Sequence, residues 1–303
     1  MDYSVIDRLE GRPGICVLRD EPMAGHTTFR IGGPADRFVT VSDETALAQV
    51  LSAVKEADLP RFLLGNGSNL LVADAGYRGV VIALGGDFKQ IELEEDGRTL
   101  RCGAGASLAS LCKAARDYGL SGLEFAWGIP GSAGGAVYMN AGAYGGEMKD
   151  VLVSATAVSG QGEKRNYSGE ELALSYRHSV FSGGESIITS LRVRLSPAPV
   201  EDIQRRMNEL LSRRREKQPL EFPSAGSTFK RPEGYFAAAL IEQCGLKGYT
   251  IGGAQVSLKH SGFLINTGHA TCREMIALIE HVRYVVEERT GVRLETEIEF
   301  LGM

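Results

Sequence analysis

Residues 128–146 read GIPGSAGGAVYMNAGAYGG and hold seven glycines in nineteen positions. A turn needs only one or two glycines, so this number indicates a further use of the bare backbone. A surface without bulky side chains suits a long flat ligand that lies along the chain. Close packing between neighbouring segments is the alternative explanation, and the residues alone leave it open. Glycine is abundant elsewhere as well, at 38 of 303 residues, well above the usual share of ~7%.

A second glycine-rich segment, GNGSN at residues 65–69, follows the short apolar run Phe62-Leu63-Leu64. Small residues leave consecutive backbone N–H groups able to converge on an anion such as pyrophosphate. The side chains of Ser68 and Asn69 add further donors. A hairpin turn built on Asn66-Gly67 is the alternative. We predict that this loop and residues 128–146 together hold a phosphate-bearing cofactor.

A third segment, GAGAS at residues 103–107, resembles the start of a dinucleotide-binding fingerprint. The third glycine is replaced by Leu108, and no strand with a terminal acidic residue follows at the expected distance. We therefore predict only a tight turn between a strand and a helix. The chain also lacks a Walker lysine motif, which excludes a P-loop nucleotide triphosphatase.

Bulk properties exclude several classes of protein. The net charge of −5 gives no reason to expect a nucleic acid or an anionic membrane as partner. No apolar run approaches the ~18 residues of a membrane helix, and the first residues lack the pattern of an export signal. Five scattered cysteines without a Cys-x-x-Cys pair and five histidines without His-x-x-x-His spacing predict neither disulfides nor a metal site. We expect a cytoplasmic protein.

Hydrophobic periodicity and capping residues predict a mixture of helices and strands. Helices are expected at about 43–57 with Ser42 as N-cap, after Ser107, at 200–217 and at 236–244. The last helix should begin at a capping box of Thr271 and Glu274 and end at Gly291. Strands are expected at 62–64, 79–84, 89–94, 99–102, 151–158, 187–195 and 293–300. This mixed order favours an α+β fold over one regular doubly wound sheet, with a boundary near residues 196–199.

Several motifs carry a resemblance to a known family. They are TFRIGGPA at 28–35, the two glycine-rich segments, SYRHS at 175–179, SAGSTFK at 224–230, IGGAQV at 251–256 and LETEI at 294–298. In this order the chain, from about residue 20 to 300, resembles the UDP-N-acetylenolpyruvoylglucosamine reductases. The resemblance implies an α+β fold with a two-part FAD-binding region of the vanillyl-alcohol-oxidase type and a C-terminal α+β substrate-binding domain. The expected domains are residues 1–77 and 78–196 for FAD and 197–303 for substrate.

The resemblance also implies a reaction. NADPH is expected to reduce non-covalently bound FAD, and the flavin to reduce UDP-N-acetylglucosamine enolpyruvate to UDP-N-acetylmuramate for peptidoglycan. Ser227 matches the proton donor, and Arg177 and Glu297 match the residues that bind and polarise the substrate carboxylate. The alternation of Leu294, Thr296 and Ile298 with glutamates places Glu297 on the accessible face of an extended segment, which permits this role.

Further positions match the family's binding residues. Those expected to contact the cofactor are Arg30, Gly65, Asn66, Gly67, Ser68, Asn69, Gly128, Ile129, Gly131, Ser132, Gly134, Gly135, Asn140 and Gly142. Those expected to contact the substrate are Tyr144, Lys217, Lys259 and His260. The segment between Arg177 and Ser227 is short, which is typical of the subtype without an inserted loop whose tyrosine covers the substrate. A monomer is favoured.

Two alternative functions predict a different set of residues. A flavoenzyme of the same fold that oxidises an alcohol or amine would not need the set Ser227, Arg177 and Glu297. A nucleotide-sugar sensor without activity would be expected to lack at least one of the three. The presence of all three favours the reductase.

Overall fold

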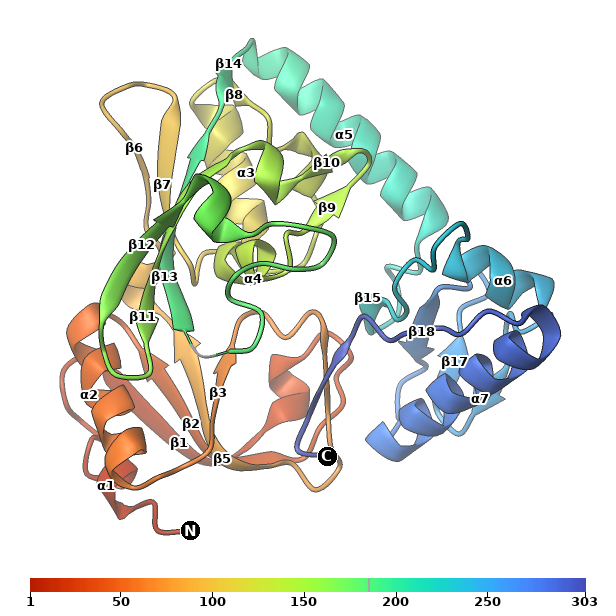
Figure 1. Cartoon of the computed structure of the whole chain (residues 1–303), viewed down its shortest axis with the longest axis horizontal. Helices are drawn as coiled ribbons and strands as arrows, with labels where there is room; N and C mark the ends of the chain where they lie inside the picture. Colours follow the sequence, from red (N-terminus) through yellow and green to blue (C-terminus); the bar gives the residue numbers. More distant parts are fainter. Residues whose placement is uncertain (185) are drawn as a thin grey trace. The chain divides into compact units, whose positions relative to one another are not determined.

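The computed structural model describes residues 1–184 and 186–303 (Figure 1). The chain divides into two compact units. Unit 1 consists of residues 1–19, 37–66 and 79–213, and unit 2 of residues 20–36, 67–78 and 214–303. Each unit combines helices with strands and has its own hydrophobic core. The predicted α+β fold class is confirmed. The sequence does not divide at one place, because short N-terminal segments belong to unit 2.

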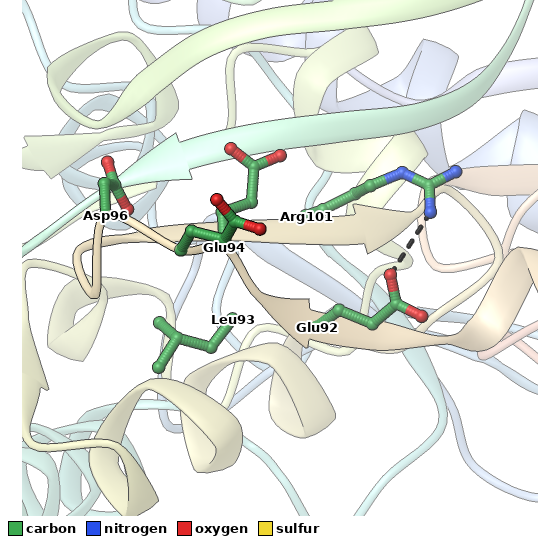
Figure 2. Close-up of a pocket in the computed structure, with 6 residues that line it drawn as sticks. Glu92, Leu93, Glu94, Asp96 and Arg101 are labelled. Atoms are coloured by element: carbon green, nitrogen blue, oxygen red, sulfur yellow. Dashed lines mark hydrogen bonds and ion pairs between the residues drawn. The ribbon is translucent and has the colours of Figure 1, made fainter.

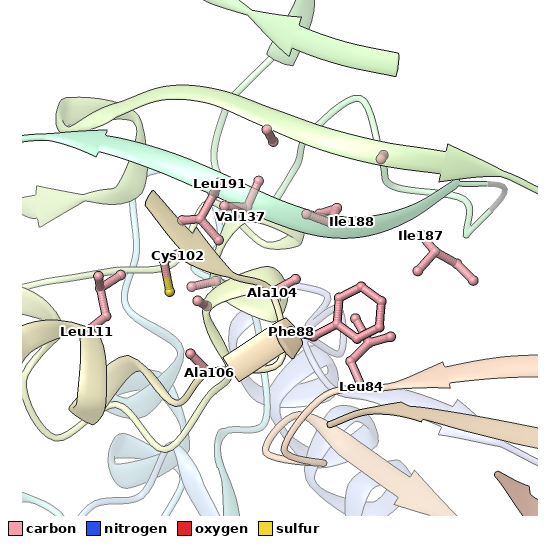
Figure 3. Packing of buried hydrophobic residues seen from close by; sticks show 14 of the residues in the cluster. Leu84, Phe88, Cys102, Ala104, Ala106, Leu111, Val137, Ile187, Ile188 and Leu191 are labelled. Carbon is pink, nitrogen blue, oxygen red and sulfur yellow. The ribbon is translucent and has the colours of Figure 1, made fainter. Parts of the chain in front are cut away.

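One sheet of unit 1 is antiparallel and has the strand order β12-β11-β13-β7-β6. Its strands are Lys164–Ser168, Leu152–Ser159, Ser186–Arg194, Thr99–Gly103 and Ile91–Leu93, respectively. The helices α3 (Leu108–Asp117) and α4 (Ala133–Tyr138) follow in the chain, and α4 lies against β13 and β7. Figure 3 shows Leu191, Cys102, Val137 and Leu111 in this core. The predicted cap of α3 is confirmed, since Ser107 Oγ accepts the N–H of Ser110 at 3.0 Å.

A second sheet has the order β1-β2-β5-β3, with strands Ile15–Pro22, Pro34–Val41, Tyr77–Leu84 and Arg61–Leu64. The helices α1 (Ser4–Asp7) and α2 (Glu44–Glu56) contact each other beside it. The predicted N-cap of α2 was wrong. Asp43 accepts the N–H of Ala46 at 2.8 Å, while the Ser42 hydroxyl bonds to the Asp43 carboxylate at 3.2 Å. A carboxylate at this position caps the helix and also interacts favourably with the positive end of the helix dipole.

Unit 2 is built on a four-stranded antiparallel sheet of order β15-β18-β17-β16. Its strands are Ser224–Ser227, Phe263–Asn266, Ala254–Val256 and Thr250–Ile251. The helix α5 (Val200–Lys217) leads into it, α6 is Ala237–Gln243, and α7 (Cys272–Thr290) lies against β16 and β17. The capping box of Thr271 and Glu274 and the left-handed Gly291 at the end of α7 are confirmed.

The predicted strand at 293–300 was wrong in its bounds. Only β19 (Glu299–Leu301) forms a ladder, parallel to β4 (Leu70–Val72). Within residues 294–298, the described β pairing is a single isolated antiparallel bridge between Thr296 and Phe229. The predicted alternation holds only in part, because Leu294 and Ile298 are buried while Thr296 and Glu297 are both half-buried.

The remaining elements are short. The strands β8 (Leu120–Ser121) and β14 (Ser196–Pro197) pair, as do β9 (Gly142–Ala143) and β10 (Gly146–Glu147). Turns of 3₁₀ helix span Met23–His26, Gly86–Lys89, Glu124–Ala126, Met148–Asp150 and Gly169–Leu172. Among residues 1–184 and 186–303, no helix combines the length and hydropathy that a membrane span requires. The described histidine, cysteine and acidic side chains form no group of three suited to a metal ion.

Candidate active site

Residues 65–66 of one glycine-rich segment and residues 130–132 of the other meet in unit 1. The side-chain amide of Asn66 donates to the carbonyl of Pro130 at 3.1 Å. A Cβ atom at Gly65 would lie 2.6 Å from Ser132 Oγ. That hydroxyl is not free to move away, because it caps α4 by accepting the N–H of Gly135 at 3.1 Å. Residues 65–66 and 130–132, which belong to the two segments predicted to hold a cofactor together, therefore lie against each other.

Residues 128–146 do not form one extended surface. They fold into a turn, the helix α4 and the hairpin of β9 and β10. The N–H groups of Ala133 and Gly134 donate to the carbonyls of Ala106 and Ala104 at 2.8 and 2.9 Å. A Cβ atom at Gly134 would lie 2.7 Å from Ala104 Cβ, and both alanines belong to the core (Figure 3). Several of the seven glycines thus permit close packing, the explanation that the sequence had left open.

The other glycine positions of this run are placed by backbone contacts. Gly128 has a φ of +86°, and Gly131 accepts the N–H of Leu108 at 3.0 Å. Ile129 packs against the core of unit 1. A Cβ atom at Gly142 would lie 2.8 Å from Glu147 Cβ across the hairpin. Residues 103–107 form the predicted tight turn between β7 and α3.

The loop at 65–69 offers backbone donors. The N–H groups of Asn66, Gly67, Ser68 and Asn69 find no acceptor within the described residues. Gly67 has a φ of +58°, and a Cβ atom there would collide with the carbonyl of His26. A run of four N–H groups that have no acceptor among the described residues, and that includes the left-handed Gly67, has the donor chemistry of an anion nest. The loop therefore fits a phosphate group.

Trp127, the single tryptophan of the chain, precedes Gly128. Its indole Nε1 is buried and has no acceptor in the described part of the chain. Buried indole N–H groups usually find a partner, so this donor fits a ligand with acceptor atoms. The neighbouring glycine run could have drawn attention to Trp127 in the sequence.

Ser227 lies in unit 2 on a β-bulge. Ser224 pairs with Ile265 and Ser227 with Phe263, so β15 carries one residue more than β18 between these pairs. Gly226 takes up the extra residue with a φ of +74°. Such a bulge redirects the side chain that follows it. The half-buried Ser227 hydroxyl makes no hydrogen bond to any described residue.

Glu297 is held on the segment next to Ser227. The N–H of Glu297 donates to the carbonyl of Thr228 at 2.8 Å. The amide of Asn69 donates to the Glu297 carbonyl at 3.0 Å, and the Asn69 carbonyl accepts the N–H of Glu299 at 2.9 Å. Unit 2 therefore brings together the backbones of Ser227, Glu297 and Asn69. The anchoring roles of Thr228 and Asn69 gave no signal in the sequence.

Arg177 belongs to unit 1 and stands at the tip of a tight turn. Ser175 and His178 exchange two backbone hydrogen bonds, of 3.1 and 3.2 Å. Arg177 has a φ of +54°, which is uncommon for a residue with a side chain. Its guanidinium carbon lies 5.0 Å from the centre of the exposed Tyr176 ring. The same unit holds Tyr144, which with Gly145 forms the turn between β9 and β10; both have positive φ, as a type I′ turn requires.

The other predicted residues lie in unit 2. Arg30 is exposed with a φ of +56°, and Lys217 is the exposed last residue of α5. The ammonium of Lys259 lies 3.7 Å from the carboxylate of Glu221. Nδ1 of His260 accepts the N–H of Gly262 at 3.2 Å, and burial lowers the pKa of this histidine, which favours its neutral form at pH 7.

A cavity of about 510 Å³ lies at the hairpin of β6 and β7, and none of the predicted site residues lines it (Figure 2). Its lining consists of Glu92, Leu93, Glu94, Glu95, Asp96 and Arg101. Two of the carboxylates are already paired, Glu92 with Arg101 at 3.3 Å and Glu94 with Arg192 at 2.6 Å. The excess of negative charge disfavours a phosphate-bearing ligand.

Comparisons with known proteins match both parts of the chain. Residues 35–168 match the family model of an FAD binding domain, and residues 218–301 match that of the UDP-N-acetylenolpyruvoylglucosamine reductase C-terminal domain. The reductase of Agathobacter rectalis is 49% identical over 97% of this chain and 96% of its own length. That of Syntrophomonas wolfei is 49% identical over 93% and 94%. The crystal structure of the reductase from Thermus caldophilus is similar with a TM-score of 0.81, at 38% identity, over 95% of this chain and 98% of that one.

Proposed function

The chain belongs to the UDP-N-acetylenolpyruvoylglucosamine reductase family, and we propose that it reduces UDP-N-acetylglucosamine enolpyruvate to UDP-N-acetylmuramate. The enzyme is an FAD-dependent oxidoreductase of peptidoglycan precursor synthesis, with NADPH as the reductant. The observation that carries the proposal is the Ser227 hydroxyl, which has no hydrogen-bond partner among the described residues and lies on a bulge beside the segment of Glu297.

The cofactor is held mainly by backbone. The N–H groups of residues 66–69, which have no acceptor among the described residues, would bind the pyrophosphate of FAD. Arg30, in the motif at residues 28–35, would add a positive charge to this site. Residues 128–135 and the indole N–H of Trp127 would complete the flavin site. When bound, FAD supplies the hydride that NADPH has delivered.

Three side chains then act on the substrate. Addition of a hydride to the terminal carbon of the enolpyruvyl double bond leaves negative charge on the adjoining carbon and its carboxylate. Arg177 and Glu297 bind and polarise this carboxylate, so they stabilise the charge as it develops. Ser227 donates a proton to the neighbouring carbon. One hydride and one proton thus convert the C=C bond to a C–C bond, and NADPH becomes NADP⁺.

The remaining parts of the proposal concern substrate binding and organisation. Tyr144, Lys217, Lys259 and His260 bind the nucleotide sugar. Residues 1–77 and 78–196 form the two FAD-binding subdomains, and residues 197–303 form the substrate-binding domain. The protein acts as a cytoplasmic monomer. The absence of tyrosine between Arg177 and Ser227 supports the shorter subtype.

Purified protein tests the function directly. We expect it to be yellow and to oxidise NADPH only when the enolpyruvyl sugar is supplied. Colourless protein would contradict the assignment of the cofactor. Bleaching of the flavin by NADPH without reoxidation by the enolpyruvyl sugar would favour another flavoenzyme of this fold or a sensor.

A further inference from the structure

Asn140 is buried in unit 1 where three segments of the chain meet, with only 1% of its surface exposed. It follows α4, and its N–H donates to the carbonyl of Val137 at 3.1 Å. Its φ of +41° lies in the left-handed region, which asparagine tolerates better than most residues with side chains. The backbone alone thus gives a reason for asparagine at this position.

The side chain of Asn140 connects three segments. Nδ2 donates to the carbonyl of Ser175 at 3.0 Å and to Oε2 of Glu147 at 2.6 Å. Oδ1 accepts the N–H of Lys149 at 2.9 Å. Both amide hydrogens are used within the protein. The side chain therefore has no donor left for a cofactor.

The bond to Ser175 bears directly on Arg177. Ser175 and His178 close the turn through two backbone hydrogen bonds, and only Tyr176 and Arg177 lie between them. Since so short a turn has little freedom, the place of the Ser175 carbonyl decides the place of the Arg177 backbone. Ser179, fully buried, fixes the other side of the turn by donating to the carbonyl of Tyr138 at 2.8 Å.

We propose that Asn140 is a positioning residue for Arg177, acting through the carbonyl of Ser175, and that its side chain does not contact the cofactor. The inference rests on the proposed role of Arg177 in binding the substrate carboxylate. A displacement of about 1 Å in a group that binds the reacting part of a substrate costs roughly 10²-fold in rate.

The test compares the two half-reactions in the flavin-loaded enzyme by stopped-flow absorbance. For Asn140→Ala we expect flavin content and reduction by NADPH within about twofold of the unaltered enzyme. Reoxidation by the enolpyruvyl sugar should be slower by roughly 10- to 100-fold, on the scale of such displacements. If this variant does not fold, Asn140→Asp keeps the size and the left-handed backbone but lacks both donors, and serves the same test.

Thr189→Val is the matched control. Thr189 is buried in the same unit, and its hydroxyl donates to the carbonyl of Thr156 at 3.3 Å in the sheet. The control should lower the melting temperature without slowing reoxidation. Loss of flavin from the Asn140 variants, with normal reoxidation of the flavin that remains, would overturn the inference in favour of a cofactor contact.

A double-mutant cycle separates this inference from the proposed function. In an Arg177→Ala background, Asn140→Ala should cause little further loss, because the group that it positions is absent. If the rate losses of the two single variants multiply in the double variant, the two residues act independently. This result would overturn the inference and leave the role of Arg177 intact. If Arg177→Ala alone reoxidises at the normal rate, the proposed role of Arg177 fails, and the inference fails with it.

Discussion

The Arg177 turn in unit 1 and the Ser227 bulge in unit 2 each contain a residue on left-handed backbone, Arg177 itself and Gly226, but they are held by different means. The turn is anchored by buried side chains, the amide of Asn140 and the hydroxyl of Ser179. The bulge is anchored by the backbone itself, with Gly226 at a φ of +74° and the ladder to β18. We therefore expect the Arg177 turn to lose its conformation when a polar side chain is removed. The Ser227 bulge should lose its conformation when Gly226 is replaced by a residue with a side chain.

The largest effect on flavin binding is expected from Gly67→Ala, at another position of unit 2 that depends on glycine. The new Cβ would collide with the His26 carbonyl, so the backbone of the loop must shift. Strain of about 1–3 kcal/mol should weaken FAD binding by roughly 5- to 150-fold, measured by flavin fluorescence. Gly97→Ala, at a φ of +64° with open space around it, is the control and should retain flavin. Full flavin content in Gly67→Ala would show that the loop does not hold the cofactor.

A smaller effect is expected from Gly226→Val. No atom lies within 4 Å of a Cβ placed there, but the left-handed backbone costs a residue with a side chain ~1–2 kcal/mol. If relief of this strain turns the bulge, Ser227 is displaced and reoxidation by the enolpyruvyl sugar slows, by roughly tenfold or more on the scale of misplaced groups. Gly97→Val should cost similar stability without this loss of rate. Equal rates in the two variants would mean that the bulge does not direct Ser227.

Ser179→Ala tests the region held by side chains. The Tyr138 carbonyl loses a donor and the N–H of Phe181 loses its acceptor. An unsatisfied buried group costs about 1–3 kcal/mol, so the melting temperature should fall and reoxidation should slow several-fold, with flavin reduction by NADPH unchanged. An unaltered reoxidation rate would mean that Ser179 does not fix the Arg177 turn and that Asn140 alone anchors it.

The smallest effect concerns stability alone. Hydrogen bonds from the Arg37 guanidinium hold the pKa of Asp7 below its ordinary value. The folded carboxyl therefore binds a proton more weakly than the unfolded one. The contribution of the ionised Asp7 carboxylate to the free energy of unfolding is complete above the unfolded pKa of ~4. This contribution is lost as the pH falls through the folded pKa. Asp7→Asn should lower the melting temperature by a few degrees at most at pH 7 and flatten its decline below about pH 4. Both half-reactions should keep their rates at pH 7.

Much of this fold could be predicted from the sequence because helix ends are local. The capping box at Thr271 and the cap at Ser107 depend on residues three positions apart. The strand at 293–300 was predicted too long, because alternation reports burial and does not show whether a neighbour completes a ladder. The division into units lay beyond the sequence, because residues 20–36 and 67–78 join unit 2 through distant partners.

The candidate site could be predicted only in part for the same reason. The motifs identified the loop at 65–69 and Ser227 by resemblance. They could not reveal that Asn140 bonds to Ser175 or Asn69 to Glu297, contacts that join residues far apart in the chain. The sequence had also left open whether the glycines of residues 128–146 serve a ligand surface or close packing, and in helix α4 Gly134 permits close packing against Ala104.

The most direct test of the central claim is a stopped-flow measurement of both half-reactions in Ser227→Ala. If Ser227 donates the proton, NADPH should reduce the flavin at nearly the normal rate. Reoxidation by the enolpyruvyl sugar should be slower by about 10²- to 10⁴-fold, the range of general acid catalysis. An equal loss in both half-reactions, or normal reoxidation, would contradict the role of Ser227.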